Sequence, residues 1–124
     1  MDKQKLPKPT IEDLIDKGNS DIQKLFNNLR LNIKKINQNI KEYSTSRYIG
    51  YKLVKNKTLF AEVHIRKEKI EFHLRPIDYF ASKLIIKKAP DSHRWTLNKL
   101  VDISHESDLN SMMNLVEQSY KNVL

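Results

Sequence analysis

The strongest constraint on the fold is the strict alternation of apolar and polar residues in two neighbouring segments, 59–66 and 70–75. If a turn centred on residues 67–68 joins them, Val63 faces Phe72 and every apolar residue meets an apolar partner. A shift of one residue would put charges into the core, so the pattern fixes this register. The other predicted pairs are Ala61 with Leu74, Ile65 with Ile70, Glu62 with His73 and His64 with Glu71. The turn lacks glycine, so we expect a four-residue loop rather than a two-residue one.

Further strands are predicted on both sides of this hairpin. Residues 40–43 form a possible short strand, and 47–54 alternates with its apolar residues on one face. A last strand is expected over 95–103. The segment 77–88 leans towards a helix, although Leu84–Ile86 could instead form a strand.

Helices are predicted at both ends of the chain. Thr10 begins a short helix, and Ser20 with Gln23 forms a capping box that begins a long one. A terminal helix follows Ser104 or Ser107, either of which could cap it. The apolar stripes of the two long helices comprise Ile22, Leu25, Phe26, Leu29, Ile33 and Ile36 in the first, and Leu109, Met112, Met113, Val116, Tyr120 and Val123 in the second.

Together these elements predict an α+β fold. It is a two-layer sandwich in which the N- and C-terminal helices pack on one face of an antiparallel sheet of about four strands. With 124 residues, the chain is long enough for one core, so we expect a single domain over residues 10–124. Residues 1–9 are charged and contain two prolines, which is typical of a disordered basic lead-in.

The composition excludes several kinds of site. Without cysteine there is no disulfide framework, zinc ribbon or thiol nucleophile. Charged residues interrupt every apolar stretch, so we expect no membrane span and no secretory signal. With only Gly18 and Gly50 there is no glycine-rich phosphate loop, so no cofactor is expected. The lack of cysteine fits a cytoplasmic protein.

Positive charge is concentrated in the strand region. The net charge is +8, and the segment 46–75 carries eight Lys or Arg against three Glu. Such clustering favours an anionic partner such as DNA or RNA, the alternative being lysines that only keep the protein soluble. The candidate nucleic-acid-binding residues are Lys52, Lys55, Lys57, Arg66, Lys67, Lys69, Arg75, Lys87, Lys88 and Arg94.

Three aromatic residues are candidates for stacking on bases. Tyr48 and Phe60 occupy the polar phase of their strands, and Trp95 begins the last predicted strand, close to His93. Alternatively, Tyr48 and Phe60 pack beneath a helix or a partner chain, and Trp95 closes the core.

A cluster of two histidines and two glutamates occupies the polar face of the hairpin. Glu62, His64, Glu71 and His73 are residue types that bind zinc or manganese. On the sequence alone we favour cross-strand ion pairs, and we expect no metal and no catalytic residue.

Several short motifs, taken in order, resemble a known family. They are Tyr48–Leu53 (YIGYKL), Ile70–Leu74 (IEFHL), His93–Trp95, Asp102–Ser104, Asp108–Leu109 and Leu115–Tyr120. Together they resemble domain of unknown function 5655 (DUF5655), sometimes labelled a predicted transport protein, over about residues 10–122. The resemblance implies a role beside DNA or in defence, because that family often lies C-terminal to nuclease-like domains of prokaryotic proteins.

The leading functional hypothesis is a non-enzymatic accessory domain that binds nucleic acid. Contacts would be mainly to phosphate, with little sequence preference. The first alternative is a protein–protein interaction module, whose partner could be a nuclease-type protein or domain. The second alternative, a small metal-dependent hydrolase, rests on the histidine and glutamate cluster.

Overall fold

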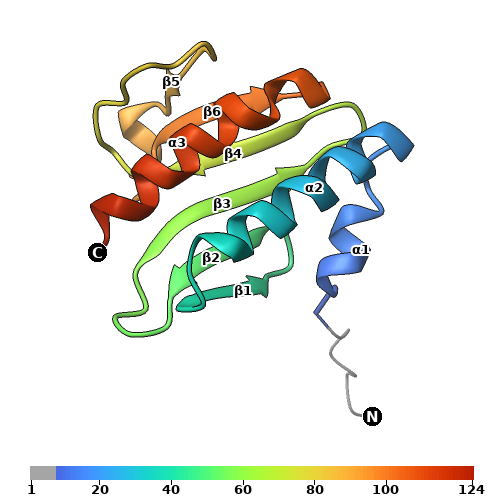
Figure 1. The fold of residues 1–124 in the computed structure, drawn as a ribbon, viewed down its shortest axis with the longest axis horizontal. Helices are drawn as coiled ribbons and strands as arrows, with labels where there is room; N and C mark the ends of the chain where they lie inside the picture. Colours follow the sequence, from blue (N-terminus) through green and yellow to red (C-terminus); the bar gives the residue numbers. More distant parts are fainter. Residues whose placement is uncertain (1–7) are drawn as a thin grey trace.

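The computed structural model describes residues 8–124, so residues 1–7 of the expected lead-in lie outside the described part. The elements follow the chain in the order shown in Figure 1. They are α1 (Ile11–Ile15), α2 (Ser20–Ile36), β1 (Ile40–Ser44), β2 (Ile49–Leu53), β3 (Leu59–Ile65), β4 (Ile70–Leu74), β5 (Lys87–Lys88), η1 (Asp91–His93), β6 (Lys99–Ile103), η2 (Glu106–Asp108) and α3 (Leu109–Asn122).

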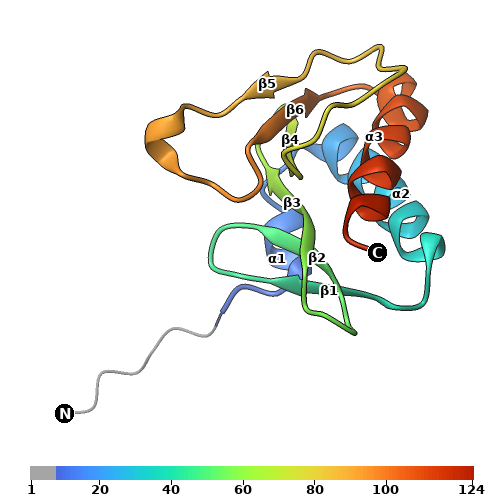
Figure 2. The same cartoon turned by 90° about the vertical axis from the view of Figure 1, so that its left-hand side faces the viewer.

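The strands form one antiparallel sheet in the order β1-β2-β3-β4-β6-β5. Helices α2 and α3 lie on one face of this sheet (Figures 1 and 2). The predicted α+β class is therefore confirmed. The sheet has six strands rather than about four, because 40–44 is a full edge strand and Lys87–Lys88 adds a short one at the other edge.

The register of the central hairpin is the predicted one. Val63 pairs with Phe72 across β3 and β4, and both side chains are fully buried beneath the helices. The four residues Arg66–Lys69 connect the strands, and the Arg66 amide donates to the Lys69 carbonyl at 2.9 Å. Apolar pairing was sufficient to fix this register, although the turn has no glycine.

A β-bulge between β2 and β3 corrects the prediction for Phe60. Tyr51 pairs with Ala61, but the next residue, Lys52, pairs with Leu59, so Phe60 is an extra residue on β3. The bulge turns Phe60 into the core beside Ala61, where its ring lies 5.4 Å from that of Tyr120 in α3. Phe60 is fully buried and is not available to stack on a base.

The helix starts differ in part from those predicted. Thr10 forms a complete capping box with Asp13, as its sequence suggests. The cap of α2 is Asn19 rather than Ser20, and its Oδ1 accepts from the Ile22 amide at 2.9 Å. Neither Ser104 nor Ser107 caps α3, because the 3₁₀ turn η2 leads directly into it. None of the helices in the described range 8–124 is long and apolar enough to cross a membrane.

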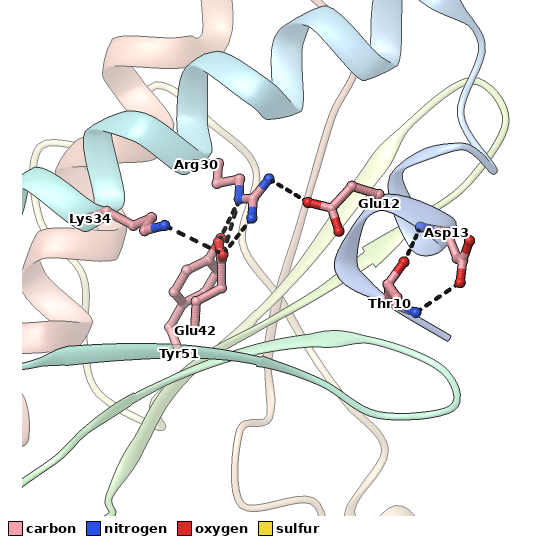
Figure 3. Close-up of polar contacts among 7 residues, drawn as sticks. All are labelled: Thr10, Glu12, Asp13, Arg30, Lys34, Glu42 and Tyr51. Atoms are coloured by element: carbon pink, nitrogen blue, oxygen red, sulfur yellow. Dashed lines mark hydrogen bonds and ion pairs between the residues drawn. The ribbon is translucent and has the colours of Figure 1, made fainter. Parts of the chain in front are cut away.

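A partly buried ion pair joins the edge strand β1 to α2 (Figure 3). Glu42 points to the helix side, where Arg30 Nε lies 3.0 Å from each of its carboxylate oxygens. The Tyr51 hydroxyl also donates to Glu42, at 2.7 Å. The hydrogen bond that Arg30 donates to Glu42 raises the pKa of Arg30, and burial raises the pKa of Tyr51 well above its ordinary value. The pair thus supplies polar partners to groups that the helices remove from water.

The segment after Pro76 is not a helix, contrary to its helix-leaning pattern. It runs as irregular chain until β5 and is held by the side chain of Gln118 in α3. Gln118 accepts from the Phe80 amide at 3.1 Å and donates to the Phe80 carbonyl at 2.9 Å. The N–H and C=O groups of Phe80 thus have hydrogen-bond partners without forming a helical turn or pairing with a strand.

Candidate functional site

A pocket of about 620 Å³ lies on the outer face, which we define as the sheet face opposite α2 and α3. The alternation that buries Val63 and Phe72 places their strand neighbours here. The segment around η1 lies on the same side of the sheet (Figure 2). The lining comprises Lys17, Arg47 and Arg66, the aromatic Tyr48 and Trp95, the cluster Glu62, His64, Glu71 and His73, and Leu59, Thr96 and Leu97.

A row of aromatic rings crosses the outer face. In order, the rings are Tyr43, Tyr48, His64, His73, Trp95 and His93. His64 and His73 stack with centroids 4.4 Å apart, and Trp95 lies 5.2 Å from His73 at an interplanar angle of 27°. Trp95 remains 44% exposed, so it covers the histidines rather than closing the helix-side core.

The row begins over Gly50. A Cβ at this position would collide with the Tyr43 ring, so the glycine lets that ring lie against β2. Lys52 Nζ lies 4.8 Å from the centroid of the same ring, within the range of a cation–π interaction. Burial and the neighbouring Tyr48 raise the pKa of Tyr43 above its ordinary value.

The histidine and glutamate cluster forms one of the two predicted cross-strand contacts, Glu62 with His73, and adds contacts that were not predicted. The cross-strand positions pair as expected, yet His73 Nε2 bonds Glu71 Oε1 of its own strand at 2.8 Å. Glu62 Oε2 lies 3.5 Å from His64 Nε2 and 3.8 Å from His73 Nδ1. The predicted ion pair between His64 and Glu71 does not form among these contacts. His64 Nε2 is buried and has no hydrogen-bond partner among the described residues.

The acidity of Glu71 reflects two opposing effects. Burial acts to raise the pKa of Glu71, but the hydrogen bond and charge of His73, with Arg66 nearby, lower it by more. The net result is a pKa below the ordinary value, so Glu71 is an anionic acceptor at neutral pH. A carboxylate can only accept, which makes His73 Nε2 the donor.

The ten predicted basic residues do not form one surface. Arg66 lines the pocket, and Lys67 and Lys69 lie in the adjoining turn, where Lys69 pairs with Asp102 at 3.1 Å. Lys55 and Lys57 lie in the β2–β3 turn at the opposite end of β3, which is roughly 20 Å away at about 3.3 Å per residue (Figure 1).

The remaining basic candidates are scattered. Lys52 of β2 lies over the ring of Tyr43 of β1. Arg75 Nε donates to Asn122 Oδ1 in α3 at 3.2 Å. Lys87 and Lys88 form β5, where Lys88 pairs with Asp91 at 3.2 Å, and Arg94 follows η1 in the left-handed conformation. Only part of the predicted set therefore borders the aromatic row.

Two cationic residues of the pocket and one tyrosine of the row were not predicted as site residues from the sequence. Arg47 directly precedes Tyr48, and its place at the start of an alternating strand was a usable signal. Tyr43 lies two residues after Lys41 in the first strand, so both side chains are expected on the same, outer face of the sheet. Lys17 reaches the pocket from the turn after α1, and nothing in the local sequence indicates that approach.

Comparison with known proteins gives the family and no function. Among curated proteins and among solved structures, none matches this chain. The family model described as "Domain of unknown function (DUF5655)" matches residues 11–123, nearly the whole chain. The resemblance noted in the sequence motifs is confirmed, and the chain belongs to the DUF5655 family.

Proposed function

We propose that the outer face of the sheet binds nucleic acid, without catalysis and with little sequence preference. The observation that carries the proposal is the row of rings bordered by the guanidinium groups of Arg47 and Arg66. Aromatic rings on neighbouring strands of a sheet are a common platform for unpaired bases, because every base has a flat face to stack on.

In this proposal the exposed aromatic ring contacts the bases, and the cations contact the phosphates. Trp95 is the most accessible ring at the pocket and would stack on a base. Arg47, Arg66 and Lys17 would contact the phosphates beside it. Glu62 and Glu71 oppose a phosphate, so these three cations must outweigh two carboxylates in the same pocket. We therefore expect single strands to bind better than duplexes.

The setting we propose is the prokaryotic cytoplasm, where the domain would serve a nuclease or a defence protein. This setting rests on the family's frequent position beside nuclease-like domains. It names a context for the nucleic acid and assigns no chemistry to the domain.

The test uses Trp95, which is the single tryptophan of the chain. Titration with labelled single- and double-stranded DNA and RNA would be followed both by anisotropy of the label and by quenching of Trp95 fluorescence. We expect Trp95→Ala to weaken single-strand binding about 5- to 150-fold, the range that stacking of one base implies.

Matched double variants separate the pocket from the rest of the basic surface. Arg47→Gln with Arg66→Gln should weaken binding strongly. Lys55→Gln with Lys57→Gln removes the same charge at the far end of β3 and should change it little. If the second pair weakens binding more than the first, the pocket is not the binding surface.

A second candidate is a protein-interaction module, which the exposed apolar residues of the segment after Pro76 favour. Phe80 is 70% exposed and Ile85 is 78% exposed, both on the chain anchored by Gln118. If the intact protein binds no nucleic acid at ~50 mM salt, where phosphate contacts are strongest, this candidate takes first place.

A further inference from the structure

We propose that Glu62, His64 and His73 form a binding site for a divalent transition metal, with zinc as the best-fitting ion. This site is independent of nucleic-acid binding, because it rests only on side chains in the floor of the pocket. The sequence favoured ion pairs at these positions, but the arrangement of the side chains supports a metal.

The spacing of the three ligand atoms suits a tetrahedral ion. One nitrogen from each histidine and one oxygen of Glu62 all lie within 4.8 Å of one another. Glu62 Oε2 is 3.5 Å from His64 Nε2 and 3.8 Å from His73 Nδ1. Zinc bonds of ~2.0–2.1 Å require neighbouring ligand atoms about 3.4 Å apart. Two of the three spacings are therefore already close to coordination geometry. The imidazoles of His64 and His73, which stack with centroids 4.4 Å apart, must turn so that the plane of each ring contains the ion.

The outer contacts of the cluster are those of a metal-bound histidine. Glu71 accepts from His73 Nε2 at 2.8 Å, so the nitrogen that a neutral His73 would offer to an ion is Nδ1, which lies 3.8 Å from Glu62. A metal-bound histidine almost always donates its other ring N–H to a carboxylate, a backbone carbonyl or a water, which fixes its tautomer and ring orientation. An ion pair between Glu62 and His73 Nδ1 does not require a second carboxylate, that of Glu71, on His73 Nε2.

A second, independent observation comes from His64. Its Nε2 atom is buried and has no hydrogen-bond partner among the described residues, and the 3.5 Å to Glu62 is too long for a strong bond. A buried nitrogen without a partner costs free energy, which coordination of an ion would offset. The same atom is one of the three that the metal requires.

The donor set defines the kind of site. Two imidazoles and one carboxylate, all from side chains that line the pocket, leave one position of a tetrahedral ion free, as in zinc sites that keep a position for water or a ligand. Magnesium and calcium bind mainly to oxygen ligands, so a site with two nitrogen donors does not suit them.

Isothermal titration of untagged, chelator-treated protein with Zn²⁺ tests the proposal, with no nucleic acid present. We expect one ion per chain, and a Co²⁺ titration should give the visible absorption of a tetrahedral or five-coordinate ion. His64→Ala and His73→Ala should each lower the affinity more than about 100-fold. Glu71→Gln should retain the stoichiometry and lower the affinity about 10- to 100-fold, as expected for an outer carboxylate.

The controls use the other two histidines of the chain. His93→Ala with His105→Ala removes both remaining imidazoles and should leave the affinity and the cobalt spectrum unchanged. Far-UV circular dichroism verifies folding, and Glu62→Gln replaces any histidine variant that does not fold. Failure of the wild type to bind Zn²⁺ below ~100 μM, or unchanged binding in Glu62→Gln or His64→Ala, would overturn the site.

Discussion

Phe72 occupies the middle of the core, on the strand that also carries His73 to the outer face. Its side chain is fully buried beneath the helices and pairs with Val63 across the hairpin. We expect Phe72→Ala to lower the free energy of unfolding by about 3–5 kcal/mol, because it removes a ring and leaves a cavity. Urea denaturation measures this change. Leu31→Ala, at a position 59% exposed, is the control and should change it by less than about 0.5 kcal/mol.

Glu71 gives the residue-scale prediction for pH. Its pKa in the folded protein lies below the ordinary value of 4.5, because the hydrogen bond and charge of His73 outweigh the effect of burial. The carboxylate therefore stabilises the fold above about pH 4.5, and this stabilisation is lost as the pH falls through the folded-state pKa. Melting temperatures between about pH 3 and 6 should fall less steeply in Glu71→Gln than in the wild type.

Glu68→Gln is the matched control for this pH dependence. Glu68 lies exposed in the turn of the same hairpin, away from His73. The acid dependence of the melting temperature should match the wild type in this variant. A wild-type slope in Glu71→Gln would contradict the role assigned to the Glu71–His73 contact.

At the scale of elements, Gln118 determines the path of the chain after Pro76. Its amide bonds both polar groups of Phe80, so α3 supplies the partner that a strand would otherwise provide. We expect Gln118→Ala to speed amide hydrogen exchange over residues 77–86, because the backbone groups of Phe80 lose their partner. Asn114→Ala, whose bond to the Ala81 carbonyl is a weaker 3.4 Å, should speed exchange much less.

The elements differ in how much of them the sequence could predict. The β3–β4 register followed from apolar pairing, because a shift of one residue brings charge into the core. The path after Pro76 could not be predicted, since it depends on Gln118 almost forty positions further along the chain. The burial of Phe60 was missed for a similar reason. A bulge changes the face of a residue without changing the local pattern.

For the whole molecule, the proposed function predicts a specific salt dependence. Each phosphate contact of a single strand contributes about −0.7 to the slope of log affinity against log salt. Replacing both Arg47 and Arg66 by Gln should therefore make the slope shallower by about 1.4. Anisotropy titrations across a salt series measure the slope. An unchanged slope together with weaker binding would mean that these arginines do not contact phosphate.

The candidate site was partly predictable at this scale. Tyr48, Trp95, Arg66 and the histidine cluster were identified from strand phase and residue type, and the structure brings them to one pocket. Lys17 joins them only through the tertiary fold, and Lys55 and Lys57 lie at the other end of the sheet. The alternation within a strand specifies the sheet face on which a side chain lies. The position of a turn residue along that face depends on which end of the sheet its turn occupies.

The hairpin that forms the core also carries the floor of the pocket, on alternate residues of the same two strands. Val63 and Phe72 are packed beneath the helices, while Glu62, His64 and His73 point the other way. The floor is therefore as rigid as the core and is preorganised before any ligand arrives. A ligand would lose little affinity to ordering these side chains. If the site adapts to ligands of different shape, the segment that changes conformation is that of Trp95, which lies outside the regular strands.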